Sequence, residues 1–158
     1  DTTGLWFFNS SKEAGASQPH RHFQLLPRHL DQNICPRYKW FCSLLANRTN
    51  NKSYIANCIA IKARNYNNKF EAIDLYNSYK LMAKDMNLGD ISNSQKPTKP
   101  YNLIITKNWI SLITRKSHSS YGFAINALGF AGYFLGTNKS NNEYLIKFGP
   151  EEVLKNVV

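Results

Sequence analysis

Residues 4–24 read Gly-Leu-Trp-Phe-Phe-Asn-Ser-Ser-Lys-Glu-Ala-Gly-Ala-Ser-Gln-Pro-His-Arg-His-Phe-Gln, and no other segment says as much about the architecture. Its first six residues form a short aromatic run that is typical of a buried strand. The residues from Ser10 to Pro19 are rich in Ser, Gly, Ala and Pro, which indicates a loop. The following residues, 20–26, alternate in polarity and predict a second strand. One face of that strand would carry His20, His22 and Gln24.

The segments on the C-terminal side of this region add further strands and one clear helix. Tyr38–Ala46 and Tyr54–Ala63 are rich in apolar and aromatic residues, which predicts two strands joined as a hairpin through residues 47–53. Residues 70–86 predict a helix, because apolar residues recur at alternating spacings of four and three. This stripe comprises Ala72, Tyr76, Tyr79, Ala83 and Met86, and is widened by Leu75 and Met82.

The last third of the chain predicts a second hairpin and a terminal helix. Tyr101–Thr106 and Trp109–Thr114 are strand-like on either side of a tight-turn pair, Lys107 and Asn108. Pro150, followed by two glutamates, is typical of the first turn of a short helix. Residues 90–100 carry two prolines and are the expected hinge between two halves of the fold. The whole pattern predicts an α+β fold with a mainly antiparallel sheet and flanking helices.

Length and composition exclude several classes of protein. The chain has 158 residues, 42% of them hydrophobic and 13% aromatic, so residues 1–158 are expected to form a single domain with a sizeable core rather than a disordered segment. No apolar run approaches the ~20 residues of a membrane span, and the start at Asp1 shows no signal-peptide pattern. Three cysteines without a Cys-x-x-Cys spacing favour a reducing, cytoplasmic setting. We expect a soluble piece of a longer protein.

The formal charge of +10 indicates an anionic partner. The basic residues are spread thinly, with no run of five or more like charges, which does not favour nucleic acid. A membrane surface and a phosphorylated small molecule are the other candidates, and charge alone does not choose among the three, because the same charge is typical of a diffuse solvated surface. On the motif considered below, we expect no nucleic acid and no membrane as partner.

The loop and its neighbouring histidines are suited to phosphate chemistry. Gly15 and Ala16 would let backbone N–H groups approach an anion, and Ser17 adds a hydroxyl donor. Gln24 adds an amide donor. A neutral imidazole is a competent nucleophile toward phosphorus when a partner fixes its tautomer.

Two other interpretations of the histidines remain open on spacing alone. A His-x-His pair is also a common metal arrangement, and His29 and Cys35 could complete a four-ligand set. The histidines could equally be structural side chains with satisfied hydrogen bonds.

The motif Gly15–Gln24 resembles the active-site motif of the histidine-triad (HIT) superfamily, in the His-x-His-x-Gln form of its nucleotidyltransferases. The resemblance is closest to the diadenosine tetraphosphate phosphorylases, also called ATP adenylyltransferases. Residues 101–115 and 125–135 are similar to further segments of those enzymes, in the same order. Residues 113–115, Ile-Thr-Arg, depart from the Val-Pro-Arg-like triplet that is usual there.

The resemblance implies a HIT-like fold and a role for each matching residue. His22 would be the nucleophile that attacks the α-phosphorus and becomes adenylylated, His20 would support it, and Gln24 would stand where the hydrolytic branch has a third histidine. The residues implied to line the phosphate site are Asn9, Gly15, Ala16, Ser17 and Gln18. Further phosphate candidates are Lys107, Arg115, Lys116 and His118.

The implied reaction is double displacement, in which a dinucleoside polyphosphate and phosphate give ATP and ADP. No tightly bound cofactor or protein-held metal is implied, and Mg²⁺ would enter with the nucleotide. The chain would be the C-terminal portion of the enzyme and would hold part of the adenosine site. The alternatives are another HIT transferase or hydrolase, acting for example on nucleotide sugars, and a non-enzymatic module that binds a metal or nucleic acid.

Overall fold

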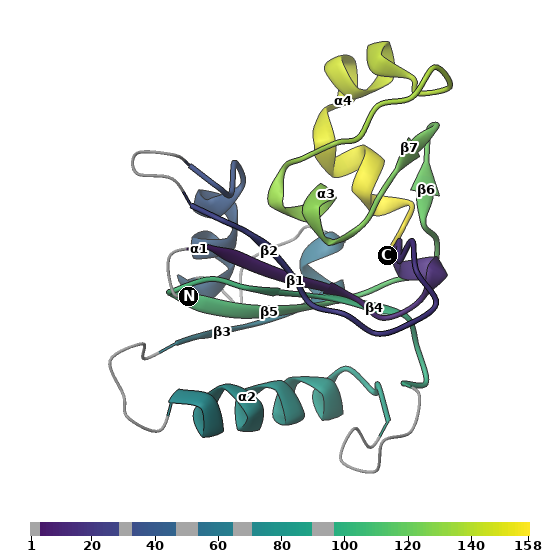
Figure 1. Ribbon diagram of the computed structural model, residues 1–158. Helices are drawn as coiled ribbons and strands as arrows, with labels where there is room; N and C mark the ends of the chain where they lie inside the picture. Colours follow the sequence, from purple (N-terminus) through teal and green to yellow (C-terminus); the bar gives the residue numbers. More distant parts are fainter. Residues whose placement is uncertain (1–3, 29–32, 47–53, 65–70, 90–96) are drawn as a thin grey trace.

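A five-stranded sheet forms the centre of the computed structural model, which describes residues 4–28, 33–46, 54–64, 71–89 and 97–158. The strand order is β2-β1-β4-β5-β3, and every neighbouring pair is antiparallel (Figure 1). The strands are β1 Leu5–Asn9, β2 Gln24–Leu26, β3 Ile59–Ala63, β4 Tyr101–Ile105 and β5 Trp109–Thr114. A separate small hairpin joins β6 Ser119–Ser120 and β7 Phe123–Ala124.

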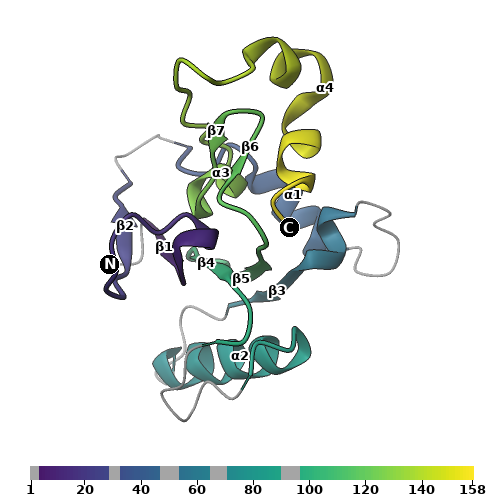
Figure 2. The ribbon, with the colours of Figure 1, turned by 90° about the vertical axis from the view of Figure 1, so that its right-hand side faces the viewer.

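Helices cover both faces of the sheet. Figure 2 shows α2 below one face, and α1, α3 and α4 above the other. The helices are α1 Tyr38–Ala46, α2 Glu71–Asp85, α3 Ala127–Ala131 and α4 Asn142–Lys155, with short 3-10 turns at Lys12–Ala14 and Ile55–Cys58. The prediction of an α+β fold with a mainly antiparallel sheet and flanking helices is confirmed.

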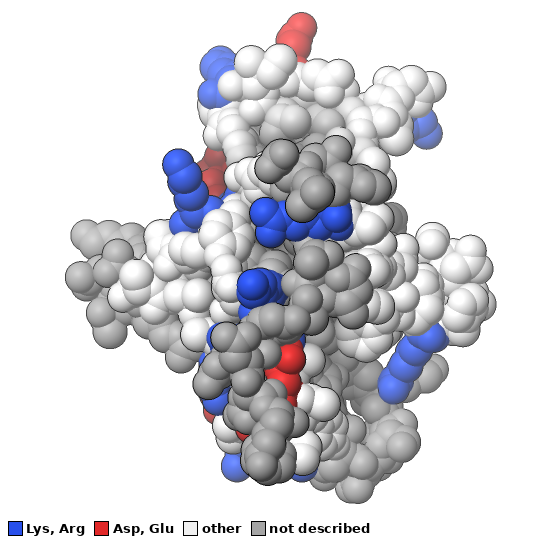
Figure 3. All heavy atoms as spheres, turned by 60° about the vertical axis from the view of Figure 1, so that its left-hand side comes forward, with Lys and Arg blue, Asp and Glu red and all other residues white. Residues whose placement is uncertain are grey.

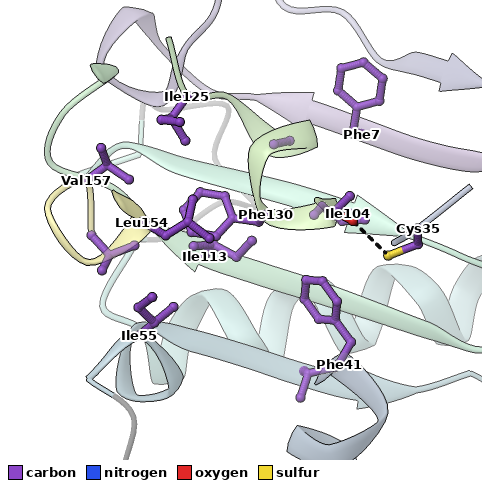
Figure 4. Packing of buried hydrophobic residues seen from close by; sticks show 14 of the residues in the cluster. Phe7, Cys35, Phe41, Ile55, Ile104, Ile113, Ile125, Phe130, Leu154 and Val157 are labelled. Carbon is purple, nitrogen blue, oxygen red and sulfur yellow. Dashed lines mark hydrogen bonds between the residues drawn. The ribbon is translucent and has the colours of Figure 1, made fainter. Parts of the chain in front are cut away.

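Strand alternation divides the buried side chains into two clusters. Phe7 and Ile104 face α1, α3 and α4, whereas Phe8 and Leu103 face α2. The larger cluster is centred on Phe41, whose ring stacks on Trp109 at a centroid distance of 4.4 Å. Figure 4 shows side chains from the sheet and the helices above it converging on this core.

Several elements match the expectations from sequence. Strand β1 lies within residues 4–9, β4 and β5 form the expected hairpin, and α2 matches residues 71–85 of the predicted helix. Only part of the apolar stripe of α2 is buried, however. Met82 and Ala83 are buried, whereas Tyr76 is 50% exposed, because the N-terminal part of the helix stands beside a cavity.

The predicted hairpin of residues 38–63 is wrong. Tyr38–Ala46 forms helix α1, in which Phe41 and Leu44, three positions apart, are buried on one side. The aromatic content of this segment favours a strand, whereas the spacing of its apolar residues fits a helix. Burial against Trp109 favoured the helix. Strand β3 covers only Ile59–Ala63 and pairs with β5.

The short terminal helix predicted from Pro150 is confirmed as the second half of α4. Gly149, at φ 79°, breaks the helical backbone immediately before Pro150. The preceding half, which was not predicted, starts at Asn142, with a cap in which the Asn141 side chain accepts from the backbone N–H of Tyr144. The proposed hinge falls largely on residues 90–96, which lie outside the described residues, so the hinge and the single-domain assignment stay predictions.

Within the described residues, none of the helices combines the length and apolar character that a membrane crossing requires.

Candidate functional site

A buried polar network fixes the loop that precedes the two histidines. The Asn102 side chain donates to Asn9 Oδ1 at 2.7 Å and to the carbonyl of Ala14 at 2.8 Å. Asn9 Oδ1 also accepts from the backbone N–H of Ala127, at the start of α3, at 3.0 Å. Strands β1 and β4, the loop and α3 are thereby joined through side-chain amides. Asn9, one of the expected phosphate residues, is part of this network and also borders a polar cavity.

Arg115 lies at the centre of the same network, and its hydrogen bonds do not support the expected role of this residue as a phosphate ligand. It is only 4% exposed, and burial lowers its pKa. Its three nitrogens donate to Asn102 Oδ1 and to the carbonyl oxygens of Ala14, Ser117, Ile125 and Val157. A guanidinium has five N–H donors, and these five acceptors account for all of them. Arg115 is therefore committed to holding the loop, the C-terminal segment and the β5–β6 connection together.

The backbone N–H groups of the loop are also used internally. Gly15 N–H donates to the Lys12 carbonyl at 2.9 Å, and Ala16 N–H donates to the Ser11 carbonyl at 3.0 Å. Gly15 has φ 85°, and a Cβ atom there would lie 2.6 Å from the Ile125 carbonyl oxygen. The glycine is required for close packing against Ile125 and Asn126. Ser17 and Gln18, by contrast, are exposed at the rim of the polar cavity.

The prediction that His20, His22 and Gln24 share one strand face is wrong. Strand β2 begins only at Gln24, which pairs with Phe7 and so lies on the α1, α3 and α4 side of the sheet. Residues 20–23 precede the strand, and His22 borders a cavity on the α2 side. The proline and the polar residues before His20 do not favour the strand pairing that would extend β2 as far as His20. The structure thus brings the two histidines together, with ring centroids 5.0 Å apart, but not Gln24.

The tautomer of His22 is set by a local contact. Its Nδ1 lies 3.1 Å from the carbonyl oxygen of His20. Because a carbonyl oxygen only accepts, Nδ1 carries the proton, and Nε2 of the neutral ring keeps its lone pair. The second histidine of the motif is therefore prepared as a nucleophile or base at Nε2.

Two cavities meet at the histidine segment. The polar one, of about 770 Å³, is lined by residues that include Asn9, Ala16, Ser17, Gln18 and His20. The other, of about 430 Å³, lies between α2 and the sheet and is mostly apolar, with His22 at its edge. Arg21 lines both. The histidine pair therefore stands between a polar and an apolar cavity, as a site for an amphipathic ligand requires.

The fold places the remaining phosphate candidates in different parts of the molecule. Lys107 lies in the turn between β4 and β5, about 17 Å along the strand from Asn102 at ~3.4 Å per residue, and so is not brought to the site. His118 is exposed and close enough to Glu13 to contribute to lowering that residue's pKa, a shift caused chiefly by the side chain of Ser11. Lys116 is exposed directly after Arg115.

Three cations of the site were missed by sequence reasoning. Lys12, Arg21 and Lys99 all line the polar cavity. Arg21 lies inside the motif itself and Lys12 lies shortly before it, so their position was a usable signal. Lys99 comes from a distant segment, and only the pairing of β4 with β1 brings it near.

Among the described residues, no three His, Cys, Asp or Glu side chains are grouped closely enough to hold a metal ion. Cys35, one member of the alternative metal set, lies in the core, where its thiol donates to the Ala131 carbonyl at 3.7 Å (Figure 4). His29 lies outside the described residues. On the face shown in Figure 3, Lys and Arg side chains stand singly or in small groups and acidic side chains are few.

Comparison with solved structures confirms the HIT-like fold. The yeast Ap4A phosphorylase Apa2 superposes with a TM-score of 0.64 at 22% identity over 96% of this chain. Structures of Apa2 in complex with AMP and with Ap4A match with TM-scores of 0.63 and 0.60, at 23% and 19% identity, over 96% and 97% of this chain. The chain spans only about half of these relatives, namely 54%, 53% and 54% of their lengths.

A search among curated proteins gave no match. The family described as the ATP adenylyltransferase C-terminal domain matches residues 17–158, which include the histidine motif, the whole β4–β5 hairpin and both C-terminal helices. This match covers well over half of the chain and agrees with the fold. The chain belongs to the ATP adenylyltransferase C-terminal domain family.

Proposed function

We propose that the protein transfers an adenylyl group through His22, and that it splits diadenosine tetraphosphate with inorganic phosphate into ATP and ADP. Membership of the ATP adenylyltransferase C-terminal domain family supports this class of reaction. The name of the similar yeast enzyme, an Ap4A phosphorylase, supports this choice of substrate.

One observation carries the proposal: the contact of 3.1 Å between His22 Nδ1 and the His20 carbonyl oxygen. It leaves Nε2 as an unprotonated nitrogen on a residue that lines the apolar cavity, next to His20, which lines the polar one. No acidic side chain is needed to fix the ring, because the backbone carbonyl holds the Nδ1 proton. Phosphoramidate formation at Nε2 would leave that hydrogen bond intact.

The reaction then balances in two displacements. In the first, the Nε2 lone pair of His22 attacks the α-phosphorus, the bond from that phosphorus to the bridging oxygen breaks, and ATP leaves with the bonding electrons. In the second, a phosphate oxygen attacks the same phosphorus, the P–N bond breaks, and ADP leaves as His22 returns to its neutral form. The exposed hydroxyl of Ser17 and amide of Gln18 are available to donate to phosphate oxygens from the cavity rim.

Gln24 stands at the motif position where the hydrolytic branch has a third histidine, but its side chain does not lie beside His22. An amide cannot deliver a proton to a leaving group, whereas a histidine can. ATP is an acidic leaving group and needs no proton from the enzyme. We expect Mg²⁺, where it takes part, to arrive with the nucleotide phosphates.

The proposal is tested by isolating the intermediate. The protein is mixed with diadenosine tetraphosphate without phosphate, and the modified peptide is identified by mass spectrometry. We expect one acid-labile AMP group on His22, release of ATP, and discharge as ADP once phosphate is added. The His22→Asn variant should carry no AMP, while its thermal denaturation stays that of the parent protein.

Two results would contradict the proposal. AMP as the main product with or without phosphate would place the protein in the hydrolytic branch. Normal turnover by the His22→Asn variant would exclude this residue as the nucleophile.

A further inference from the structure

We propose that Lys99, assisted by Lys12, binds the phosphate groups that depart with ATP and then the inorganic phosphate that replaces them. This inference rests on the proposed function, since it assigns a specific task within that reaction. Neither lysine belongs to the His-x-His-x-Gln motif, and Lys99 lies 77 positions beyond His22 in the sequence.

Both lysines line the polar cavity beside the histidines. Lys99 enters from the segment that precedes β4, and Lys12 from the 3-10 turn after β1. The same cavity contains Ser17 and His20, and Arg21 forms part of its wall. At about 770 Å³ it is within the range of ~300–1,000 Å³ that is typical of sites for small organic ligands.

The backbone of Lys99 is held in place on both sides. Thr98 N–H donates to the Leu88 carbonyl at 3.0 Å, and Thr98 Oγ1 donates to the Asn87 carbonyl at 2.8 Å. After Lys99, the Pro100 carbonyl accepts from Arg115 N–H at 2.8 Å. Pro97 and Pro100 also restrict φ on either side of Thr98 and Lys99.

Hydrogen bonds of the next residue also join the Lys99 segment to the rest of the site. Tyr101 N–H donates to Ser10 Oγ at 2.8 Å, and Ser10 N–H donates to the Tyr101 carbonyl at 3.1 Å. The segment is thus joined directly to the first residue of the phosphate loop. Only the flexible side chain of Lys99 has to adjust when an anion enters.

The charges around the cavity favour an anion. Lys12, Lys99 and Arg21 are cationic, and Glu13 is the one acidic side chain in the described lining. The side chain of Ser11 lowers the pKa of Glu13, so its carboxylate is ionised and offsets one of the three positive charges. Two positive charges remain to balance a phosphate group.

An ammonium group here would act in both displacements. When the bond from the α-phosphorus to the bridging oxygen breaks, negative charge develops on the departing triphosphate, and a cation next to it stabilises that charge. After ATP has left, the same cation is available to the incoming phosphate. The inference therefore predicts that one substitution weakens phosphate binding and slows adenylyl transfer together.

The test compares Lys99→Gln, Lys99→Arg and Lys12→Gln with a matched control, Lys39→Gln, at an exposed position of helix α1. Binding of inorganic phosphate to the resting protein is measured by calorimetry, and the KM for phosphate is measured in the discharge of adenylylated protein. A charge-assisted contact of ~1.4 kcal/mol corresponds to about tenfold in binding. We expect Lys99→Gln to weaken phosphate binding about tenfold, Lys99→Arg to restore most of it, and Lys39→Gln to leave it unchanged.

The outcomes separate this inference from the proposed function. If adenylyl-His22 forms and is discharged normally in Lys99→Gln, with the parental KM for phosphate, this inference is wrong and the proposed function stands. If phosphate binding depends on Lys99 but His22 is never adenylylated, the phosphate site stands and the proposed function is wrong. Equal weakening in Lys99→Gln and Lys39→Gln would mean a general charge effect and would also overturn the inference.

Discussion

Replacing Arg115 by methionine should destabilise the protein by about 3 kcal/mol without removing a phosphate ligand. Two of its five acceptors keep another donor, because the Ala14 carbonyl also accepts from Asn102 and the Val157 carbonyl also accepts from Lys116 N–H. The other three, Asn102 Oδ1 and the carbonyls of Ser117 and Ile125, lose the donor that the structure gives them. A buried acceptor that loses its donor costs roughly 1 kcal/mol or more.

The estimate counts only these three acceptors, because the substitution also removes a buried charge whose desolvation was unfavourable. Methionine fills much of the same volume, so the cavity term is small. For a domain of this length, ~2–4 °C per kcal/mol gives a decrease in Tm of about 6–12 °C.

Thermal denaturation of Arg115→Met, with Lys116→Met as the exposed neighbouring control, measures this effect. We expect a large decrease in Tm for Arg115→Met and almost none for Lys116→Met. An unchanged Tm combined with a raised Kd for phosphate would refute the reasoning. That result would restore the role as phosphate ligand that the sequence resemblance implied.

Two further predictions concern the loop and the core. Gly15→Ala should destabilise the protein by ~1–3 kcal/mol, because φ is 85° and the new Cβ would lie 2.6 Å from the Ile125 carbonyl oxygen. The control Gly136→Ala, with no atom within 4 Å of its Cβ, should be nearly neutral in the same denaturation assay, and equal effects of the two substitutions would contradict the assigned packing. Burial raises the pKa of the Cys35 thiol to about 12 from an ordinary 9.0, so the unfolded chain loses this proton first and the thiol lowers stability as pH rises from 9 toward 12. Cys35→Ala should therefore lose less stability than the parent between about pH 8 and pH 10, and parallel losses would show that the thiol is not buried in solution.

The site was only partly predictable from the sequence, and the partly correct residues show why. His22 and His20 were proposed because their spacing and neighbours form a locally recognisable motif, and the structure does bring their rings together. Asn9 was also identified, but its amide turned out to be shared with Asn102 and Ala127, which are far away in the sequence. Arg115 was predicted to be a phosphate ligand because a sequence motif shows the residue type but not the hydrogen-bond acceptors that surround it in the fold.

The same limit applies to the secondary structure. Residues 38–46 have apolar and aromatic residues at spacings that fit a strand or a helix, and contact with Trp109 from another segment favoured the helix. Strand β2 was predicted too long because alternation alone does not show where a pairing partner ends. Strand β1 ends at Asn9, and its pairing with β2 begins at Phe7 opposite Gln24.

The sequence by itself determined β1, the β4–β5 hairpin and α2, because each depends on neighbouring residues and on side-chain period, and it also contains the histidine motif on which the proposed chemistry rests. Only the tertiary structure decided which face His22 and Gln24 occupy, that Arg115 is a buried scaffold residue, and that Lys99 joins Lys12 at the polar cavity. These outcomes depend on contacts between residues far apart in the chain. Such contacts form only when burial of the two apolar clusters brings the strands into register, and no local pattern of residues encodes that step.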